Sequence, residues 1–111
     1  MRGIVNETNG AIVSHEYKKA KSLFDNAFGL LLKSNPRTMV FVTRFGIHTF
    51  FMRKKIDVLV LDEENRVVKI KEGLLPNRIY LWNPEFFQVV ELPFGAIDKS
   101  KTKIGARLEL K

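Results

Sequence analysis

Three side chains of this sequence have the types that acid–base chemistry uses, and each belongs to a strongly apolar segment. His48 lies next to Thr49 and close to a Phe-Phe pair, Asp57 lies directly before the apolar run 58–61, and Glu91 lies inside the apolar segment 87–92. Burial of such groups is costly unless they are paired, and it perturbs their proton affinity. If the three side chains share a cleft, His48 and a carboxylate could act as base and orienting group in a hydrolytic reaction.

Each of these residues also has a purely structural interpretation. Asp57 could cap a turn, Glu91 could face solvent or form an ion pair, and His48 could be a hydrogen-bonded core residue. A carboxylate at the position of Asp57 needs donors, which are either backbone N–H groups or the cations Arg44, Arg53 and Lys54. The serines lack the context of an activated nucleophile and the glycines do not form a phosphate-binding loop, so whether the chain is an enzyme stays open.

A second set of residues could bind an anion. The chain has 19 Lys and Arg against 12 Asp and Glu, and its formal net charge of +7 attracts phosphates and acidic surfaces. Exposed aromatic side chains flanked by cations can stack on nucleic-acid bases. The candidate ligand-binding residues are Arg44, Arg53, Lys54, Arg78, Tyr80 and Trp82. We therefore favour a binding module for a nucleic acid or a phosphorylated or carboxylated small molecule, although a core or interface role for the aromatic residues is the alternative.

Several other classes of site are not predicted. The chain has no cysteine, and its two histidines have no spacing typical of metal ligands, so neither a metal nor another cofactor is expected. No apolar run approaches the roughly 20 residues of a membrane-spanning helix, and no signal peptide is visible. We expect a cytoplasmic protein without a membrane partner. Its composition is weakly typical of a thermophilic protein. The oligomeric state is not predicted, and an accessory protein that acts through a protein partner remains an alternative.

The hydrophobic pattern predicts a mostly β domain over residues 1–111 that positions these side chains. Two pairs of strands are expected to form hairpins, one around Asn9-Gly10 and one around the polar turn 63–65. The run 58–61 is apolar at every position, which predicts a strand buried on both faces. The expected strands cover residues 2–5, 11–14, 39–42, 47–52, 56–62, 66–71, 78–82, 87–92 and 104–110.

One amphipathic helix is predicted, from Ala20 to Gly29, with Leu23, Phe24 and Phe28 on its apolar face. A further helical turn is expected over Ala96–Ser100. Many short strands and one main helix favour an α+β fold. We expect a curled antiparallel sheet that forms a partly open small barrel or a sandwich, with the main helix as its cap.

A series of motifs in this chain is similar to a known family. The segments are, in chain order, Phe28-Gly29-Leu30-Leu31-Leu32-Lys33, then Met39-Val40-Phe41-Val42, then His48-Thr49-Phe50-Phe51-Met52 with Ile56-Asp57-Val58-Leu59 and Asp62, then Val90-Glu91-Leu92-Pro93-Phe94-Gly95, and last Ile104-Gly105. This series resembles the Domain of Unknown Function family 192 (DUF 192), an uncharacterised protein family. The resemblance implies a compact, mostly β domain, and it brings no established activity.

Overall fold

The computed structural model describes residues 3–19, 38–44, 46–49 and 52–111. The helix predicted from Ala20 to Gly29 lies outside these residues, and so do Phe45, Phe50 and Phe51. Within them the chain is mostly β, as predicted, with ten strands and one short helix. The elements are β1 (Ile4–Asn6), β2 (Ile12–Ser14), β3 (Lys18–Lys19), β4 (Met39–Val42), β5 (Gly46–His48), β6 (Ile56–Leu61), β7 (Val67–Leu74), β8 (Ile79–Leu81), β9 (Gln88–Pro93), α2 (Ala96–Ser100) and β10 (Leu108–Leu110).

The centre of the fold is a five-stranded sheet with the order β3-β4-β9-β6-β7. All six residues of β6 are buried, which confirms that this strand is covered on both faces. Alternate residues of a strand point to opposite faces. Leu59 therefore faces one apolar cluster and Val58 faces another.

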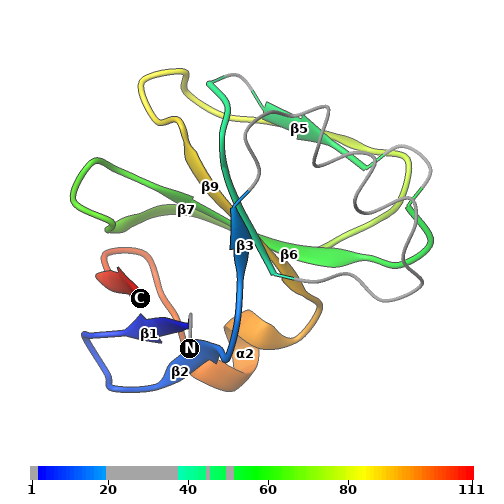
Figure 1. The fold of residues 1–111 in the computed structure, drawn as a ribbon. Coiled ribbons are helices and arrows are strands. Elements are labelled where there is room, and N and C mark those ends of the chain that lie inside the picture. Colours follow the sequence, from blue (N-terminus) through cyan, green and yellow to red (C-terminus); the bar gives the residue numbers. More distant parts are fainter. Residues whose placement is uncertain (1–2, 20–37, 45, 50–51) are drawn as a thin grey trace.

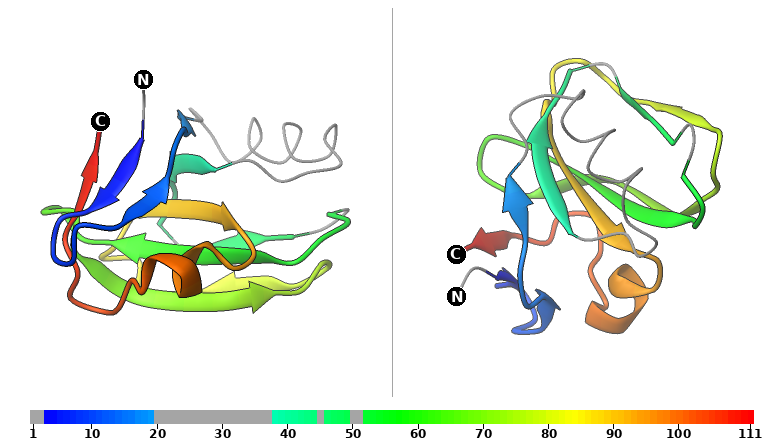
Figure 2. Two further views of the ribbon diagram at one scale, coloured as in Figure 1. Left: turned by 90° about the horizontal axis from the view of Figure 1, so that it is seen from below. Right: turned by 45° about the vertical axis from the view of Figure 1, so that its right-hand side comes forward.

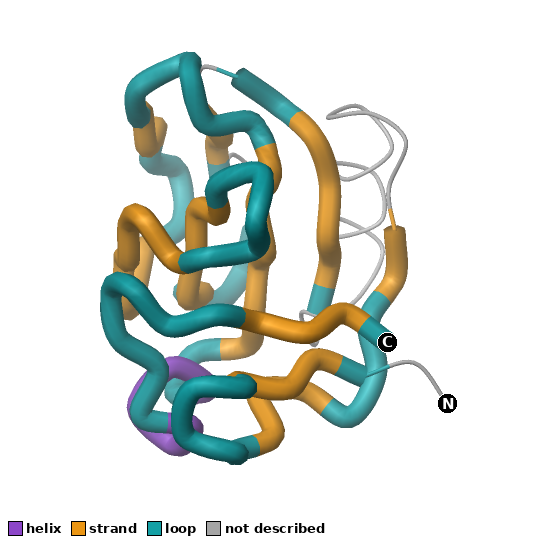
Figure 3. Tube along the Cα trace, turned by 90° about the vertical axis from the view of Figure 1, so that its left-hand side faces the viewer, coloured by secondary structure: helices purple, strands orange, loops and turns teal. Residues whose placement is uncertain are grey.

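A second layer covers the lower face of the central sheet in the orientation of Figure 1, where β1, β2 and α2 lie below β6. It consists of the three-stranded sheet β10-β1-β2 together with α2, which Figure 3 shows in purple at the same end of the molecule. The predicted hairpin is confirmed, since β1 and β2 pair antiparallel and Gly10 has a φ of 80°. The buried residues between the layers form the lower cluster: Ile4, Val13, Val40, Leu59, Leu61, Val67, Val90, Leu92, Ile97, Ala106 and Leu108.

A third layer, the two-stranded ribbon β5-β8, covers the upper face. Figure 2 shows the layers from two further directions. Ile47 of β5 pairs with Tyr80 of β8, and both side chains pack against apolar residues of the central sheet. The buried residues on this side form the upper cluster: Met39, Phe41, Ile47, Met52, Ile56, Val58, Val60, Leu74, Trp82 and Val89.

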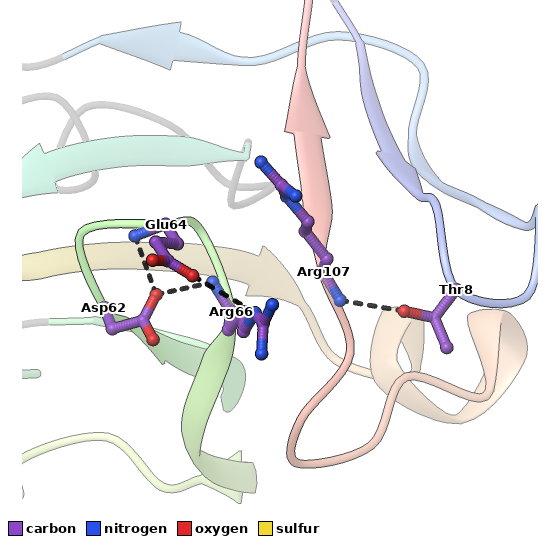
Figure 4. A network of polar contacts seen from close by, with 5 residues as sticks. All are labelled: Thr8, Asp62, Glu64, Arg66 and Arg107. Atoms are coloured by element: carbon purple, nitrogen blue, oxygen red, sulfur yellow. Dashed lines mark hydrogen bonds and ion pairs between the residues drawn. The ribbon is translucent and has the colours of Figure 1, made fainter.

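The hairpin of β6 and β7 is confirmed, and the side chain of Asp62 organises its polar turn. Asp62 Oδ1 accepts hydrogen bonds of 2.9 Å from the backbone N–H groups of both Glu64 and Arg66, as Figure 4 shows. The ion pair between Arg66 Nε and Glu64 Oε2 spans 3.5 Å between exposed side chains, so it adds little stability. On the neighbouring segment, the N–H of Arg107 donates to Thr8 Oγ1 at 3.0 Å.

Several expectations need correction. The predicted partly open barrel of one curled antiparallel sheet is not what the described residues form, because they make three open sheets in stacked layers, and β3 pairs with β4 in parallel. Strand 47–52 was predicted too long, because β5 ends at His48 and neither Thr49 nor Met52 belongs to a strand. Strand 104–110 begins only at Leu108, and Ile104 is 67% exposed, because the chain turns at Gly105 with a φ of 92°.

Candidate functional site

Asp57 is a buried carboxylate that ties three parts of the backbone together. Its exposed fraction is 0%. Oδ1 accepts a hydrogen bond of 3.0 Å from Gly73 N–H at the end of β7. Oδ2 accepts bonds of 3.0 Å from Gly95 N–H and 3.1 Å from Ile97 N–H at the start of α2. Charge-assisted bonds of this kind are stronger than neutral ones, so Asp57 fixes β7 and α2 relative to β6.

The donors to Asp57 are therefore backbone groups, which was one of the two sequence-based alternatives. The cations Arg44, Arg53 and Lys54 were the other, and all three side chains are exposed. The N-cap residue of α2 is Gly95, which has no side chain to accept the free N–H groups of the first turn. Asp57 supplies that acceptor from another strand, which explains why a carboxylate is buried at this point.

Glu91 is a second buried carboxylate, 1% exposed, but it lies on the other face of the central sheet. In the register of β6 with β9, Asp57 is opposite Leu92 of the lower cluster, while Glu91 is opposite Val58 of the upper cluster. On its other side Glu91 is opposite Met39 of β4. Paired residues of adjacent strands point to the same face, so the sheet itself separates the two carboxylates.

His48 lies in the upper ribbon, as the last residue of β5. Its neighbour Ile47 is 3% exposed and points into the upper cluster. His48 pairs with Ile79, which is 62% exposed, whereas the Nδ1 atom of His48 is itself buried. Because the sheet lies between Asp57 and Glu91, one cleft does not hold both carboxylates, which is what the hydrolytic interpretation requires.

The six predicted ligand-binding residues also separate into groups. Trp82 is 7% exposed, and its indole N–H donates to Phe86 O at 2.7 Å, so it belongs to the core. Tyr80 is half-buried, with Lys69 Nζ 4.9 Å from the centre of its ring, and burial raises the pKa of its phenol. Arg44 lies near the far end of the ribbon, where it donates to Pro84 O at 3.2 Å and stacks over Phe87.

The other three predicted residues gather with two further ones at the end of the sheet where β6 begins. Ile56, the first residue of β6, pairs with Pro93 on one side and Leu74 on the other. The residue before Ile56 is Lys55 and the residue after Pro93 is Phe94, and Lys55 Nζ lies 4.0 Å from the centre of the Phe94 ring. We call this surface the basic rim; it comprises the exposed side chains Arg53, Lys54, Lys55, Arg78 and Phe94.

Thr49 connects Arg78 to the rest of the basic rim. Its exposed fraction is 0%. Thr49 Oγ1 donates to Leu75 O at 2.7 Å and accepts from Arg78 N–H at 2.9 Å. The backbone N–H of Asn77 donates to Thr49 O at 2.9 Å, and Met52 N–H donates to the same oxygen. The backbone of Arg78 and that of Met52, the neighbour of Arg53, are therefore hydrogen-bonded to the same buried residue.

Sequence reasoning missed Thr49, Lys55 and Phe94 as parts of this site. Lys55 belongs to the run of three cations, and Phe94 lies between Pro93 and Gly95 in one of the family-like segments. A proline followed by an exposed aromatic residue and a glycine marks a turn at the end of a strand. That signal could have pointed to Phe94, whereas its proximity to Lys55 follows only from the pairing of β6 with β9.

The opposite end of β6 is acidic. A depression of about 370 Å³ there is lined by four carboxylates, those of Asp62, Glu63, Glu64 and Glu85, and by one cation, Arg66. Another depression, of about 820 Å³, lies between α2 and the β1–β2 turn, where Lys101 and Lys103 are balanced by Glu72 and Asp98. Among the described residues no cluster of His, Asp and Glu could hold a metal ion, and no helix is long and apolar enough to cross a membrane.

Comparisons with known proteins place this chain among proteins without an assigned activity. The profile of the DUF192 family, described as "Uncharacterized ACR, COG1430", matches residues 4–110. A UPF0127 protein of Pyrococcus abyssi is 34% identical over 96% of this chain and 95% of its own length. A UPF0127 protein of Thermococcus sibiricus is 33% identical over 96% of this chain and 73% of its own length. These relatives come from thermophilic archaea.

Two crystal structures share the fold at low sequence identity. A protein of unknown function from Novosphingobium aromaticivorans has a TM-score of 0.81 and 17% identity, covering 98% of this chain and 84% of its own. A candidate transcription regulator from Sinorhizobium meliloti has a TM-score of 0.78 and 16% identity, covering 98% of this chain and 91% of its own. At these identities the similarity establishes the fold alone.

Proposed function

The chain belongs to the DUF192 family, and from that premise we propose that it is a binding module that receives an anionic ligand at the basic rim. The observation that carries the proposal is the gathering of four exposed cations and one exposed aromatic ring where β6 begins. Cations at a protein surface attract phosphates, and the interaction weakens as salt is added.

The support beneath the basic rim favours a ligand-binding role over a merely solvated surface. Asp57 fixes Gly73 and Gly95, and Thr49 fixes Leu75 and Arg78, all by hydrogen bonds to the backbone. A surface whose turns are held rigidly loses less entropy when a ligand binds. Asp57, Thr49 and Gly95 all lie in the segments that resemble the family signature, so the family-like residues of this chain support this surface.

The charge distribution along β6 also favours one binding end. The strand begins beside Lys55 and ends beside Asp62, and the acidic depression surrounds its far end. A polyanion is attracted to the first end and repelled by the second. Of the six predicted ligand-binding residues, we retain Arg53, Lys54 and Arg78 and leave out the others because of their position or burial. A cytoplasmic location is part of the same proposal.

The proposal is tested by titrating the protein with a fluorescently labelled single-stranded oligonucleotide and with labelled inorganic polyphosphate. We expect binding of at least one probe at low salt, with a slope of log affinity against log salt of about −3 if four cations contact phosphates. Absence of binding to both probes at low salt would falsify the proposal.

A matched pair of variants locates the binding surface. Arg53→Glu changes the net charge as much as Lys111→Glu does, but Lys111 lies at the C-terminus, at the end of the molecule away from the basic rim (Figures 1 and 2). We expect Arg53→Glu to weaken binding several-fold and Lys111→Glu to leave it nearly unchanged, since charges farther apart than about 10 Å are largely screened. An equal loss in both variants would show that only net charge matters.

A further inference from the structure

We infer that the ligand of the basic rim is a single-stranded nucleic acid and that Phe94 is the platform on which one of its bases stacks. This inference rests on the proposed function and deepens it. Phe94 is a large apolar side chain with 54% of its surface exposed, and the ammonium group of Lys55 lies over its ring. An aromatic ring that is left in solvent beside positive charges is what single-strand binding proteins use to hold unpaired bases.

The ring of Phe94 is exposed but firmly placed. Pro93 precedes it at the end of β9, and Gly95, which follows, is held by Asp57. The backbone of Gly73 lies against the ring, since a Cβ at that position would be 3.2 Å from Phe94 Cε1. Gly73 itself is held by the other oxygen of Asp57. One buried carboxylate therefore fixes the backbone on both sides of the platform.

Lys55 supplies a positive charge for the phosphate of the nucleotide whose base stacks on Phe94. Its ammonium group lies over the Phe94 ring, at 4.0 Å from the ring centre. An ammonium in this position can leave the ring for a phosphate when a nucleotide binds, because a phosphate is the stronger partner for a cation at the surface. Arg53 and Lys54 directly precede Lys55 in the chain, and the backbone of Arg78 is bound by Thr49, so we assign the phosphates on either side to these three residues.

The arrangement of the strand ends at the rim fits an extended ligand. The rim residues follow or precede the ends of β6, β7 and β9, which lie side by side. A single strand that crosses these ends can place its phosphates on the cations and a base on Phe94. A duplex keeps its bases stacked inside and cannot use the ring in this way.

The decisive experiment compares two labelled probes of the same length and phosphate number, a single-stranded oligodeoxynucleotide and its abasic analogue. Binding is measured by fluorescence anisotropy for the wild type, Phe94→Leu and Phe94→Tyr. We expect the wild type to bind the base-bearing probe about 5- to 100-fold more tightly than the abasic one, which is the range of one stacked base. Phe94→Leu should remove most of this preference and Phe94→Tyr should restore it, because tyrosine keeps the aromatic face.

The outcomes separate this inference from the proposed function. If the abasic probe binds as tightly as the base-bearing one, the rim binds anions but no base stacks, so the inference is wrong while the proposed function stands. If neither oligonucleotide probe binds at low salt, the inference is wrong, and the proposed function is wrong too when inorganic polyphosphate also fails to bind. Equal affinity for duplex DNA also overturns the inference. Because Phe94 is more than half exposed, its variants should keep the fold, and their thermal unfolding serves as the control.

Discussion

The two faces of the central sheet are covered by different means. On the lower face, the ionised side chain of Asp57 binds backbone groups of β7 and of the start of α2. On the upper face, the ribbon β5-β8 is attached by the neutral Thr49 hydroxyl, which donates to Leu75 O, and by Lys69, which donates to Leu81 O at 3.0 Å. The lower attachment costs more to bury and is stronger once formed.

Both attachments meet at the same short segment of chain. Asp57 binds the N–H of Gly73 from the lower face, and Thr49 binds the carbonyl of Leu75, two residues later, from the upper layer. The end of β7 is therefore fixed from two sides, and Arg78 follows it. The comparison indicates that the stabilising interactions of both layers converge beneath the basic rim.

The largest expected effect is that of Asp57→Ala, which removes the lower attachment. Three backbone N–H groups would lose their acceptor in a buried position, so we expect the free energy of unfolding to fall by about 3–5 kcal/mol. Urea denaturation measures this change. Asp62→Ala, at the other end of β6, is the control, because Asp62 also accepts two backbone bonds but in an exposed turn, and about 1 kcal/mol is expected. If both variants lose the same free energy of unfolding, Asp57 stabilises the fold no more than Asp62 does.

A smaller effect is expected for Thr49→Val, which removes the main polar contact of the upper layer without changing the shape of the side chain. The Arg78 N–H would lose its side-chain acceptor and the Leu75 carbonyl its donor, so the free energy of unfolding should fall by about 2 kcal/mol. Affinity for the base-bearing probe should fall too, because the turn that carries Arg78 loosens. A variant with wild-type stability would mean that Thr49 does not hold the ribbon.

Trp82→Phe should have a still smaller effect and should not touch the ligand site. Phenylalanine keeps most of the apolar volume but cannot donate to Phe86 O, so a loss of about 1 kcal/mol in the free energy of unfolding is expected. Affinity for either probe should stay within about twofold of the wild type, because a buried residue away from the ligand contributes little to binding. A large loss of affinity would show that Trp82 does contribute to ligand binding.

The smallest effect concerns the pKa of the Tyr80 phenol, which depends on how well the upper layer excludes water. Burial raises its pKa above the ordinary value of 10.0. The folded state then holds its proton to higher pH than the unfolded state, so this contribution to stability is present below pH 10.0 and is lost as pH rises through the folded-state pKa. The chain has two tyrosines, so the Tyr17→Phe variant allows the tyrosinate absorbance of Tyr80 to be titrated alone. A midpoint at or below 10.0 would show an open upper layer.

The sequence was informative where burial alternates or is complete, and uninformative where contacts are distant. The apolar run 58–61 predicted the doubly covered strand β6, and Asn9-Gly10 predicted the first hairpin. The pattern could not show that Asp57 and Glu91 lie on opposite faces, because that depends on the register between β6 and β9, in which these two residues are 34 positions apart along the chain. The parallel pairing of β3 with β4 has no local signal either, since two residues of β3 are too few for a periodic pattern.

The candidate site was predicted only in part for the same reason. The run Arg53-Lys54-Lys55 is visible as a cluster of charge, but its partner Phe94 comes from a segment some forty residues later. For Trp82 and Tyr80 both a ligand-binding and a core role were predicted as alternatives, since the number of aromatic residues alone does not say which side chains face the core; Trp82 is buried there and Tyr80 is half-buried. Exposure of an aromatic residue depends on which layer covers it, and no local pattern encodes the layers.

Strand β7 also affects the tendency of the protein to aggregate. It is an outer strand of the central sheet and runs for eight residues, which is long enough to template pairing with another molecule and to seed fibrous aggregates. Lys69 and Lys71 interrupt its apolar positions, and a second chain that pairs there would have to bring its own lysines beside them. Like charges that meet in register repel, which opposes pairing of this strand with a second copy of itself.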